Sequence, residues 1–221
     1  MGGRAGEADA RGRGEEEGSG ASSREGAQEG RRRPVRLLAI SGSLRAASSN
    51  TALLRAASAL APEGVEVSLY EGLAGLPHFN PDLDDLDEGV APPAVEAFRS
   101  RLRASDGVLI SSPEYAHGVP GALKNAIDWV VGSGEIYEKP VALLNASRGA
   151  THAHASLVET LTTADADVVR EASVRVGLPT NRIDEAGIVS DPELSNTLRS
   201  AVTALARAIE ARRTEADKQA Q

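Results

Sequence analysis

Short apolar runs alternate with helix-like patterns from Val35 onward, and this alternation limits the fold more than any other feature of the chain. Nearly continuous apolar runs at Val35–Ile40, Gly107–Ser112 and Pro140–Asn145 predict strands that are buried on both faces of a parallel sheet. Val65–Leu69 alternates apolar and polar residues, which predicts a half-exposed strand near a sheet edge. A fifth strand is expected within Val168–Val176, where Val168-Val169 and Val174-Arg175-Val176 form only a weak pattern.

Apolar residues at helical spacing lie between and after these runs. The five stripes are Leu53, Leu54, Ala57 and Leu60; Val95, Phe98 and Leu102; Val119, Leu123, Ala126, Ile127 and Val130; Leu157, Val158, Leu161 and Ala164; and Leu194, Leu198, Val202, Leu205 and Ile209. Five strands alternating with five helices predict an α/β protein whose parallel sheet is covered on both faces. We expect a three-layer flavodoxin-like sandwich with a five-stranded parallel sheet of order 2-1-3-4-5.

Composition separates the first 33 residues from the rest of the chain. Residues 1–33 contain nine of the 22 glycines, seven arginines and seven acids, and no Leu, Ile, Val or aromatic residue. A disordered N-terminal extension is therefore predicted at 1–33, a folded domain at 34–212, and a polar C-terminal tail at 213–221.

The net charge and the missing cysteines narrow the function classes. The net charge of -8 falls on the folded part, which disfavours nucleic acid and anionic membranes as partners. The absence of cysteine excludes thiol catalysis, disulfides and Cys-ligated metals. No apolar run is long enough for a membrane span or a signal peptide, so we expect a cytoplasmic protein.

The segment after the first strand has the residues that a phosphate site needs. In a sheet of this order, ligands bind beyond the carboxyl ends of the first and third strands. Gly42–Asn50 opens a helix there, with hydroxyls at Ser43 and Ser48, an amide at Asn50 and a guanidinium at Arg45. The alternative is that Ser48 to Asn50 only cap the helix, but capping does not explain Gly-Ser-Leu-Arg.

Two further loops complete the predicted site. After the third strand, the candidate residues are Pro113, Glu114, Tyr115, Ala116, His117 and Gly118. Pro113 fixes one torsion and Tyr115 offers a ring, so this segment could hold a flat molecule. After the fourth strand, the candidates are Ser147, Arg148 and Gly149. For each loop, a plain connection from strand to helix remains the alternative. A phosphate beside a planar ring indicates FMN.

Two motifs carry a resemblance to a known family. Gly-Ser-Leu-Arg-x-x-Ser-x-Asn, with Pro-Glu-Tyr and then Gly-x-Pro-Gly-Ala-Leu-Lys-Asn-Ala-Ile-Asp-Trp, resembles the NADPH-dependent FMN reductases over about Val35 to Ile209. That family includes bacterial NAD(P)H quinone, azo and chromate reductases. The resemblance implies FMN as cofactor, NADPH or NADH as electron donor, and a quinone, free flavin, azo compound or metal oxyanion as acceptor.

The resemblance also assigns roles within the three loops. It implies that Ser43, Arg45, Ser48 and Asn50 hold the FMN phosphate, that Pro113, Glu114 and Tyr115 line the isoalloxazine, and that Ser147 to Gly149 lie nearby. The family commonly has Asn after Pro-Glu-Tyr, where this chain has Ala116, so a side-chain contact is lost that His117 could partly replace. No catalytic side chain is required, since the cofactor carries the chemistry, although Glu114 is a candidate proton or orientation partner.

Members of the family are typically homodimers or homotetramers. The segments Gly121–Val131 and Glu71–Val90 are expected near a neighbouring subunit, with Trp129 and Ile136-Tyr137 as candidate contacts. The alternative for Trp129 is that it packs under its own helix.

The sequence leaves two other functions to consider, an electron carrier and a metal site. A non-enzymatic flavodoxin-type electron carrier is the main alternative, but only 3% of the residues are aromatic, which suits an accessible flavin better than a sandwiched one. A metal site at His152 and His154 is disfavoured, because these two positions do not share a helix face, and no metal is predicted.

Overall fold

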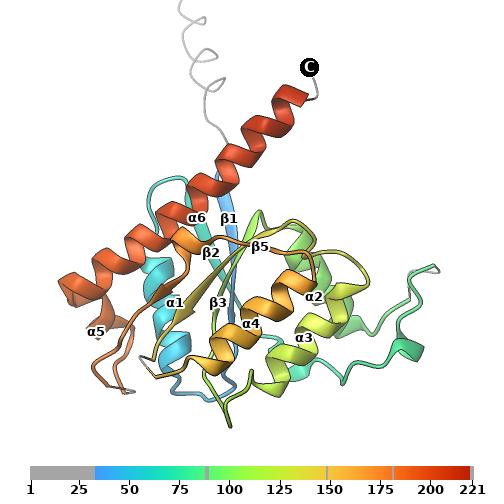
Figure 1. Cartoon of the computed structure of the whole chain (residues 1–221), viewed down its shortest axis with the longest axis horizontal. Coiled ribbons are helices and arrows are strands. Elements are labelled where there is room, and N and C mark those ends of the chain that lie inside the picture. Colours follow the sequence, from blue (N-terminus) through green and yellow to red (C-terminus); the bar gives the residue numbers. More distant parts are fainter. Residues whose placement is uncertain (1–32, 88–89, 148, 181, 220–221) are drawn as a thin grey trace, which may run out of the picture. The chain divides into compact units, whose positions relative to one another are not determined.

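A computed structural model describes residues 33–87, 90–147, 149–180 and 182–219. The predicted extension at 1–33 lies outside these ranges except for Arg33, and the compact unit begins at Pro34. Its sheet is parallel, in the order β2-β1-β3-β4-β5, which confirms the predicted fold (Figure 1). The four long strands are β1 (Val35–Ser41), β2 (Val65–Tyr70), β3 (Gly107–Ser111) and β4 (Pro140–Asn145).

The fifth position of the sheet is filled by an interrupted strand. Both β5 (Asp167–Val168) and β6 (Val174–Arg175) pair in parallel with β4, and a 3-10 turn, η3 (Arg170–Ala172), separates them. Ser173 Oγ accepts a hydrogen bond from Leu143 N of β4 at 3.1 Å, so a side chain serves where the ladder is broken. Both weak sequence candidates are therefore strand segments.

Helices cover both faces of the sheet (Figure 1). One face packs against α1 (Ser49–Ala59), α5 (Glu185–Ser190) and α6 (Pro192–Gln219), and the other against α2 (Pro93–Arg103), α3 (Gly121–Val131) and α4 (His152–Thr163). Within β1, Leu37 and Ala39 join the first core while Leu38 and Ile40 join the second. This alternation follows from the two-residue period of a strand and explains why the run is apolar from Leu37 to Ile40.

The C-terminal region differs from the prediction in two ways. The short α5 has no counterpart among the predicted helices, and α6 continues through 213–219, which were assigned to a polar tail. Arg212 pairs with Asp167 at 2.6 Å and Arg213 with Asp106 at 2.6 Å, so ionic contacts support the helix where apolar ones end. None of the helices in the described ranges combines the length and the apolar character that crossing a membrane requires.

The segment between β2 and α2 forms an arm, defined here as residues 77–87 and 90, which projects beyond the α3 side of the sheet (Figure 1). It contains a 3-10 turn, η2 (Pro81–Leu83), and an isolated antiparallel bridge between Asp85 and Val90. Two α3 side chains hold its base. Asn125 accepts from Phe79 N at 2.7 Å, and both Asn125 Nδ2 and Trp129 Nε1 donate to the Pro77 carbonyl, at 2.9 and 2.8 Å.

Burial shows which of the predicted interface residues are accessible on the surface of the subunit. Trp129 is fully buried, so the alternative that it packs within its own subunit is confirmed. Ile136 is also buried, and its place among the surface candidates was wrong, because it belongs to the core under α2 and α3. Tyr137, the third candidate, is exposed.

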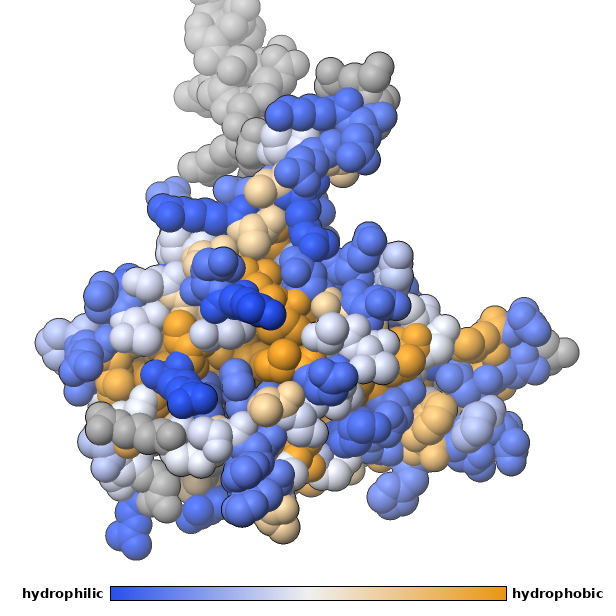
Figure 2. Space-filling model, viewed as in Figure 1, coloured by the Kyte–Doolittle hydropathy of each residue, from blue (hydrophilic) through white to orange (hydrophobic). Residues whose placement is uncertain are grey.

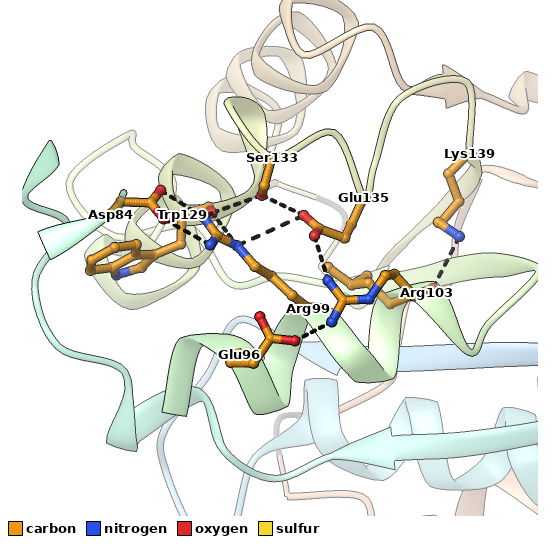
Figure 3. Close-up of polar contacts among 9 residues, drawn as sticks. Asp84, Glu96, Arg99, Arg103, Trp129, Ser133, Glu135 and Lys139 are labelled. Carbon is orange, nitrogen blue, oxygen red and sulfur yellow. Dashed lines mark hydrogen bonds and ion pairs between the residues drawn. The ribbon is translucent and has the colours of Figure 1, made fainter. Parts of the chain in front are cut away.

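A buried ion network holds the far part of the arm (Figure 3). The side chains of Arg99 and Asp84 are only 4% and 8% exposed, and the Arg99 guanidinium donates to both carboxylate oxygens of Asp84, at 2.8 and 2.7 Å. Arg99 also donates to the Trp129 carbonyl, while Glu135 accepts from Ser133 and Arg103. The hydrogen bond to Asp84 raises the pKa of Arg99 further above its usual range, so the guanidinium stays charged.

Candidate functional site

The loop between β1 and α1 closely approaches the end of β3. Gly42 N donates to the Ser111 carbonyl at 2.8 Å. A Cβ at Gly42 would lie 2.8 Å from Ser112 Oγ, which is too close for any other residue without displacement. The loops after β1 and β3 therefore begin side by side at the carboxyl end of the sheet, as the strand order predicts.

The predicted phosphate residues in this loop make contacts within the protein. Ser48 Oγ accepts from Thr51 N at 3.3 Å and caps α1, so the capping interpretation of Ser48 is confirmed. Asn50 is buried, and its Oδ1 accepts from Ser111 Oγ at 2.9 Å, which ties the start of α1 to β3. Ser43 Oγ accepts from Arg45 N at 3.3 Å. These three side chains shape the loop whether or not an anion is bound.

Arg45 behaves differently from the other three. Its side chain is exposed and has no hydrogen-bond or ionic partner within the described part of the chain. It borders a cavity of about 630 Å³ between α1 and α5, together with Arg55 and Arg182 and the carboxylates of Asp184 and Glu185. A charged side chain without an internal partner, beside a helix N-terminus, is free to bind an anion.

The segment Pro113–Gly118 forms a tight hairpin. Tyr115 and Gly118 exchange two backbone hydrogen bonds of 3.1 and 2.9 Å, and the residues between them, Ala116 and His117, have φ angles of 47° and 59°. Two successive positive φ angles are typical of a type I′ turn, which favours Asn and Gly. This turn precedes the predicted bend into the next helix, where Pro120 stands directly before α3. It places Ala116 where an Asn side chain could form a local hydrogen bond but a methyl group cannot.

Two side-chain contacts join this hairpin to α4. Glu114 Oε2 accepts from Ala153 N at 2.9 Å, in the first turn of α4, where a carboxylate also interacts favourably with the helix dipole. The His117 ring stacks on the ring of His152, the first residue of α4, with centroids 4.4 Å apart and planes 12° apart. Glu114 therefore has a structural role as a cap, besides the proton or orientation role that the sequence suggests.

The loop between β4 and α4 is organised by Asn145, which the sequence analysis did not single out. Asn145 is buried, donates from Nδ2 to the Ala150 carbonyl at 2.6 Å, and accepts from Ser147 N at 2.9 Å. Ser147 Oγ in turn accepts from Gly149 N at 3.2 Å. Arg148 lies outside the described residues. A polar residue ending an apolar strand was the signal that could have identified Asn145.

A cavity of about 640 Å³ lies where these three loops meet, and its size is typical of small-molecule sites. Of the predicted residues it brings together Asn50, Pro113, Glu114, Ser147 and Gly149. Its other lining residues are Ser49, Ser112, Ala146, Ala150, Leu178, Pro179 and Thr180.

The remaining predicted residues lie outside this cavity's lining. Arg45 and Ser48 border the α1–α5 cavity, and Ser43 lines neither cavity. The hairpin residues Tyr115–Gly118 are also absent from both linings. The segment 178–180 was missed because it follows the interrupted strand, where no motif signals a ligand.

The two histidines on α4 have different surroundings. His152 stacks on His117, while burial, and then the nearby charge of Arg175, lower the pKa of the half-buried His154. Within the ranges that the structure covers, no three His, Cys, Asp or Glu residues are grouped as metal ligands would be.

Comparison with known proteins identifies the family. Residues 35–179 match the model of the family described as NADPH-dependent FMN reductase. The chain belongs to this family. It is 36% identical over 176 residues to a Pseudomonas aeruginosa NAD(P)H-dependent FMN reductase, covering 77% of this chain and 93% of that protein. It is 32% identical over 182 residues to an Escherichia coli quinone reductase, covering 80% of this chain and 96% of that protein.

Solved structures agree with this membership. The flavoenzyme FerB of Paracoccus denitrificans, an NAD(P)H:(acceptor) oxidoreductase, superposes with a TM-score of 0.64 at 30% identity, covering 80% of this chain and 98% of FerB. The protein is thus an FMN-dependent NAD(P)H oxidoreductase of flavodoxin-like fold, as the sequence predicts, rather than a non-enzymatic electron carrier.

Proposed function

We propose that FMN binds across the carboxyl ends of β1, β3 and β4, and that the enzyme passes electrons from NAD(P)H to a small acceptor such as a quinone. The observation that carries this proposal is the cavity of about 640 Å³ at the point where the strand order reverses, enclosed by the loops after these strands. The relatives named quinone reductase and NADPH:quinone oxidoreductase support the choice of acceptor.

The first turn of α1 suits the FMN phosphate. The N–H groups of Ser49 and Asn50 lie in a turn where the helix itself offers no acceptor, and that turn has no acidic side chain. Arg45 lies in the same loop with no partner among the described residues, so it can pair with a phosphate without breaking an internal contact. This donor set fits a dianionic group.

The loops after β3 and β4 suit the flavin ring. Pro113 and Glu114 line one side of the cavity, and Ser147 and Gly149 line another. The Glu114–Ala153 bond and the Asn145 contacts fix these two walls relative to each other before any ligand binds. Bound FMN would supply the redox chemistry, accepting a hydride from the nicotinamide and returning two electrons to the acceptor.

A phosphate-dependent binding experiment tests the arrangement. FMN and riboflavin, which lacks the phosphate, are titrated into apoprotein of the native chain and of Arg45→Ala, with binding measured by quenching of flavin fluorescence. Loss of a charge-assisted contact should weaken FMN binding by about 1.5–3 kcal/mol and leave riboflavin binding unchanged. The control is Arg101→Ala, which removes an exposed arginine that donates to Ser68. An equal effect on both flavins, or none on FMN, would remove Arg45 from the phosphate site.

We further propose that the arm contacts a second copy of the chain, as expected in a family of homodimers and homotetramers. Four arm side chains are between 40% and 56% exposed: Phe79, Leu83, Leu86 and Val90. The apolar surface of the arm stands out among hydrophilic neighbours (Figure 2). A buried ion pair and three hydrogen bonds hold this segment in a fixed shape, which favours a preformed contact surface.

Light scattering of the FMN-loaded protein tests the arm. The native chain should have the molar mass of a dimer or tetramer. The double variant Leu83→Glu and Val90→Glu should be monomeric, with an unchanged circular dichroism spectrum. A native monomer, or variants that keep the native assembly, would contradict the proposal.

The cytoplasmic location of the protein stays a prediction.

A further inference from the structure

The stacked histidines join two segments whose neighbouring residues line the proposed flavin cavity. Pro113 and Glu114, at the base of the hairpin, and Gly149 and Ala150, just before α4, all line that cavity. His117, at the tip of the hairpin, is exposed and stacks on His152 of α4 across a centroid distance of 4.4 Å. The pair therefore links the hairpin to the start of α4 beside the residues that line the cavity.

The backbone of this hairpin is strained at two residues that lie outside the strands of the sheet. Ala116 and His117 both have positive φ, and a non-glycine residue in this region costs on the order of 1–3 kcal/mol. Such strain persists only where surrounding contacts hold it, and here the His117–His152 stack and the Glu114–Ala153 hydrogen bond do so. These contacts hold the His117 ring at an accessible, defined position.

Reduction of a quinone needs a proton donor as well as a hydride. A hydride carries two electrons and one hydrogen to the quinone and leaves a quinol monoanion, so one further proton must reach an oxygen to give the quinol. The best donor has an ordinary pKa near the working pH, which describes imidazole at about 6.5 better than a phenol at about 10.

The ionisable groups on these two segments differ in their availability. Glu114 already accepts a hydrogen bond from Ala153 N. His152 is exposed, but it is the first residue of α4, and the positive end of the helix dipole disfavours a cation there. Tyr115, on the same hairpin, carries a phenol, which as a chemical class is a weaker acid than an imidazolium. His117 is the remaining group, and it is exposed.

We propose that His117 donates the second proton to the acceptor, which on this view is a carbonyl compound of the quinone type. The N–H bond of the imidazolium breaks, an O–H bond forms on the quinone oxygen, and the neutral imidazole regains a proton from water. The hydride comes from the FMN-dependent activity, so the assignment rests on the proposed function. His152 acts as a positioning residue, because the stack orients the His117 ring.

The test compares acceptors that do and do not take up protons. His117→Asn and His117→Gly are chosen because both residues tolerate positive φ, so the turn itself is kept. With FMN-loaded enzyme and saturating NADPH, kcat/KM for a benzoquinone should fall by about 10²-fold or more in both variants. The rate with ferricyanide, which accepts electrons without protons, should fall far less than the benzoquinone rate.

His152→Phe keeps an aromatic stack but cannot carry a proton. This variant should retain most of the quinone activity, since His117 is still held in place. If His152→Phe lost the proton-dependent activity while His117→Asn kept it, the assignment to His117 would be wrong.

Ligand binding gives a second readout that needs no turnover. The His117 ring is followed by NMR in the oxidised holoenzyme, and 4-hydroxybenzaldehyde, a phenolate that mimics the quinol anion, is added. An anion beside the ring should raise the pKa of His117, and His117→Asn should bind the phenolate more weakly. Absence of both effects would overturn the proposal.

The outcomes separate this inference from the proposed function. A native enzyme that oxidises NADPH with neither acceptor would refute the function itself. An active native enzyme whose His117 variants reduce quinone normally, or lose quinone and ferricyanide rates equally, would refute the role of His117 alone.

Discussion

Replacing Arg99 by methionine should strongly destabilise the domain and release the arm. Arg99 donates four hydrogen bonds, two to the Asp84 carboxylate and two to the Trp129 carbonyl, from a side chain that is almost fully buried. Met has a similar length but donates nothing, so Asp84 would be left as a buried charge without its partner. Breaking a buried pair in this way typically costs about 3–5 kcal/mol.

That loss is large relative to the stability of a domain of this size. Native domains are usually stable by about 5–15 kcal/mol, so Arg99→Met should remove a substantial part of the total. For domains of 150–250 residues, 1 kcal/mol shifts Tm by about 2–4 °C, which predicts a decrease of roughly 6–20 °C. Urea denaturation followed by circular dichroism gives the free energy of unfolding, and limited proteolysis reports cleavage within residues 77–87.

A double variant separates the charge from the shape of the site. Asp84→Leu with Arg99→Met removes both charges, so it should recover much of the stability lost in Arg99→Met alone. Arg101→Met is the control, because this exposed arginine lies on the same helix and donates to Ser68, so its effect should stay within about 0.5 kcal/mol. Two results would contradict this role of the buried ion pair. One is an effect of Arg99→Met on the free energy of unfolding no larger than that of Arg101→Met, and the other is a double variant as unstable as Arg99→Met.

Three further predictions concern the hairpin and α4. Ala116→Gly should raise the free energy of unfolding by about 1 kcal/mol in urea denaturation, since glycine adopts φ near 47° without strain; no gain would contradict the turn assignment. Glu114→Gln should lower it by about 0.3–1 kcal/mol, because the amide lacks the charge that interacts with the start of α4, and high salt should reduce the difference. Burial lowers the pKa of His154 below its usual 6.5, so the unfolded state binds more protons and stability should fall as pH decreases from 6.5 toward the folded value. In thermal unfolding, His154→Gln should lack that part of the acid sensitivity, and an identical pH dependence would refute it.

The strand order could be predicted because each long strand carries its own pattern. Val35–Ile40 is apolar on both faces and Val65–Leu69 on one, so the buried and peripheral positions follow from the residues themselves. The fifth strand gave a weak signal because a 3-10 turn divides it and the hydroxyl of Ser173 replaces part of its ladder. A side chain serving as a ladder partner leaves no periodic pattern.

The arm and the hairpin show where sequence reasoning ends. Asp84 and Arg99 resemble ordinary solvated charges, since nothing local indicates that residues 15 positions apart meet in a buried pair. Left-handed backbone at Ala116 could not be foreseen either, because alanine rarely adopts it. The loop after β1 opens a helix as predicted, and its phosphate role stays a prediction. The internal contact of Asn50 depends on β3 lying beside the loop, which its own sequence does not reveal.

The broken outer strand also bears on how two such sheets could meet. An uninterrupted edge offers a row of free N–H and C=O groups on which another chain can add a strand. At the β5 and β6 side, each piece is two residues long and a turn separates them, so no such row exists there. The opposite edge, β2, runs unbroken from Val65 to Tyr70. Any aggregation of this protein by strand addition should therefore begin at β2, where Glu66 is the charged residue in its path.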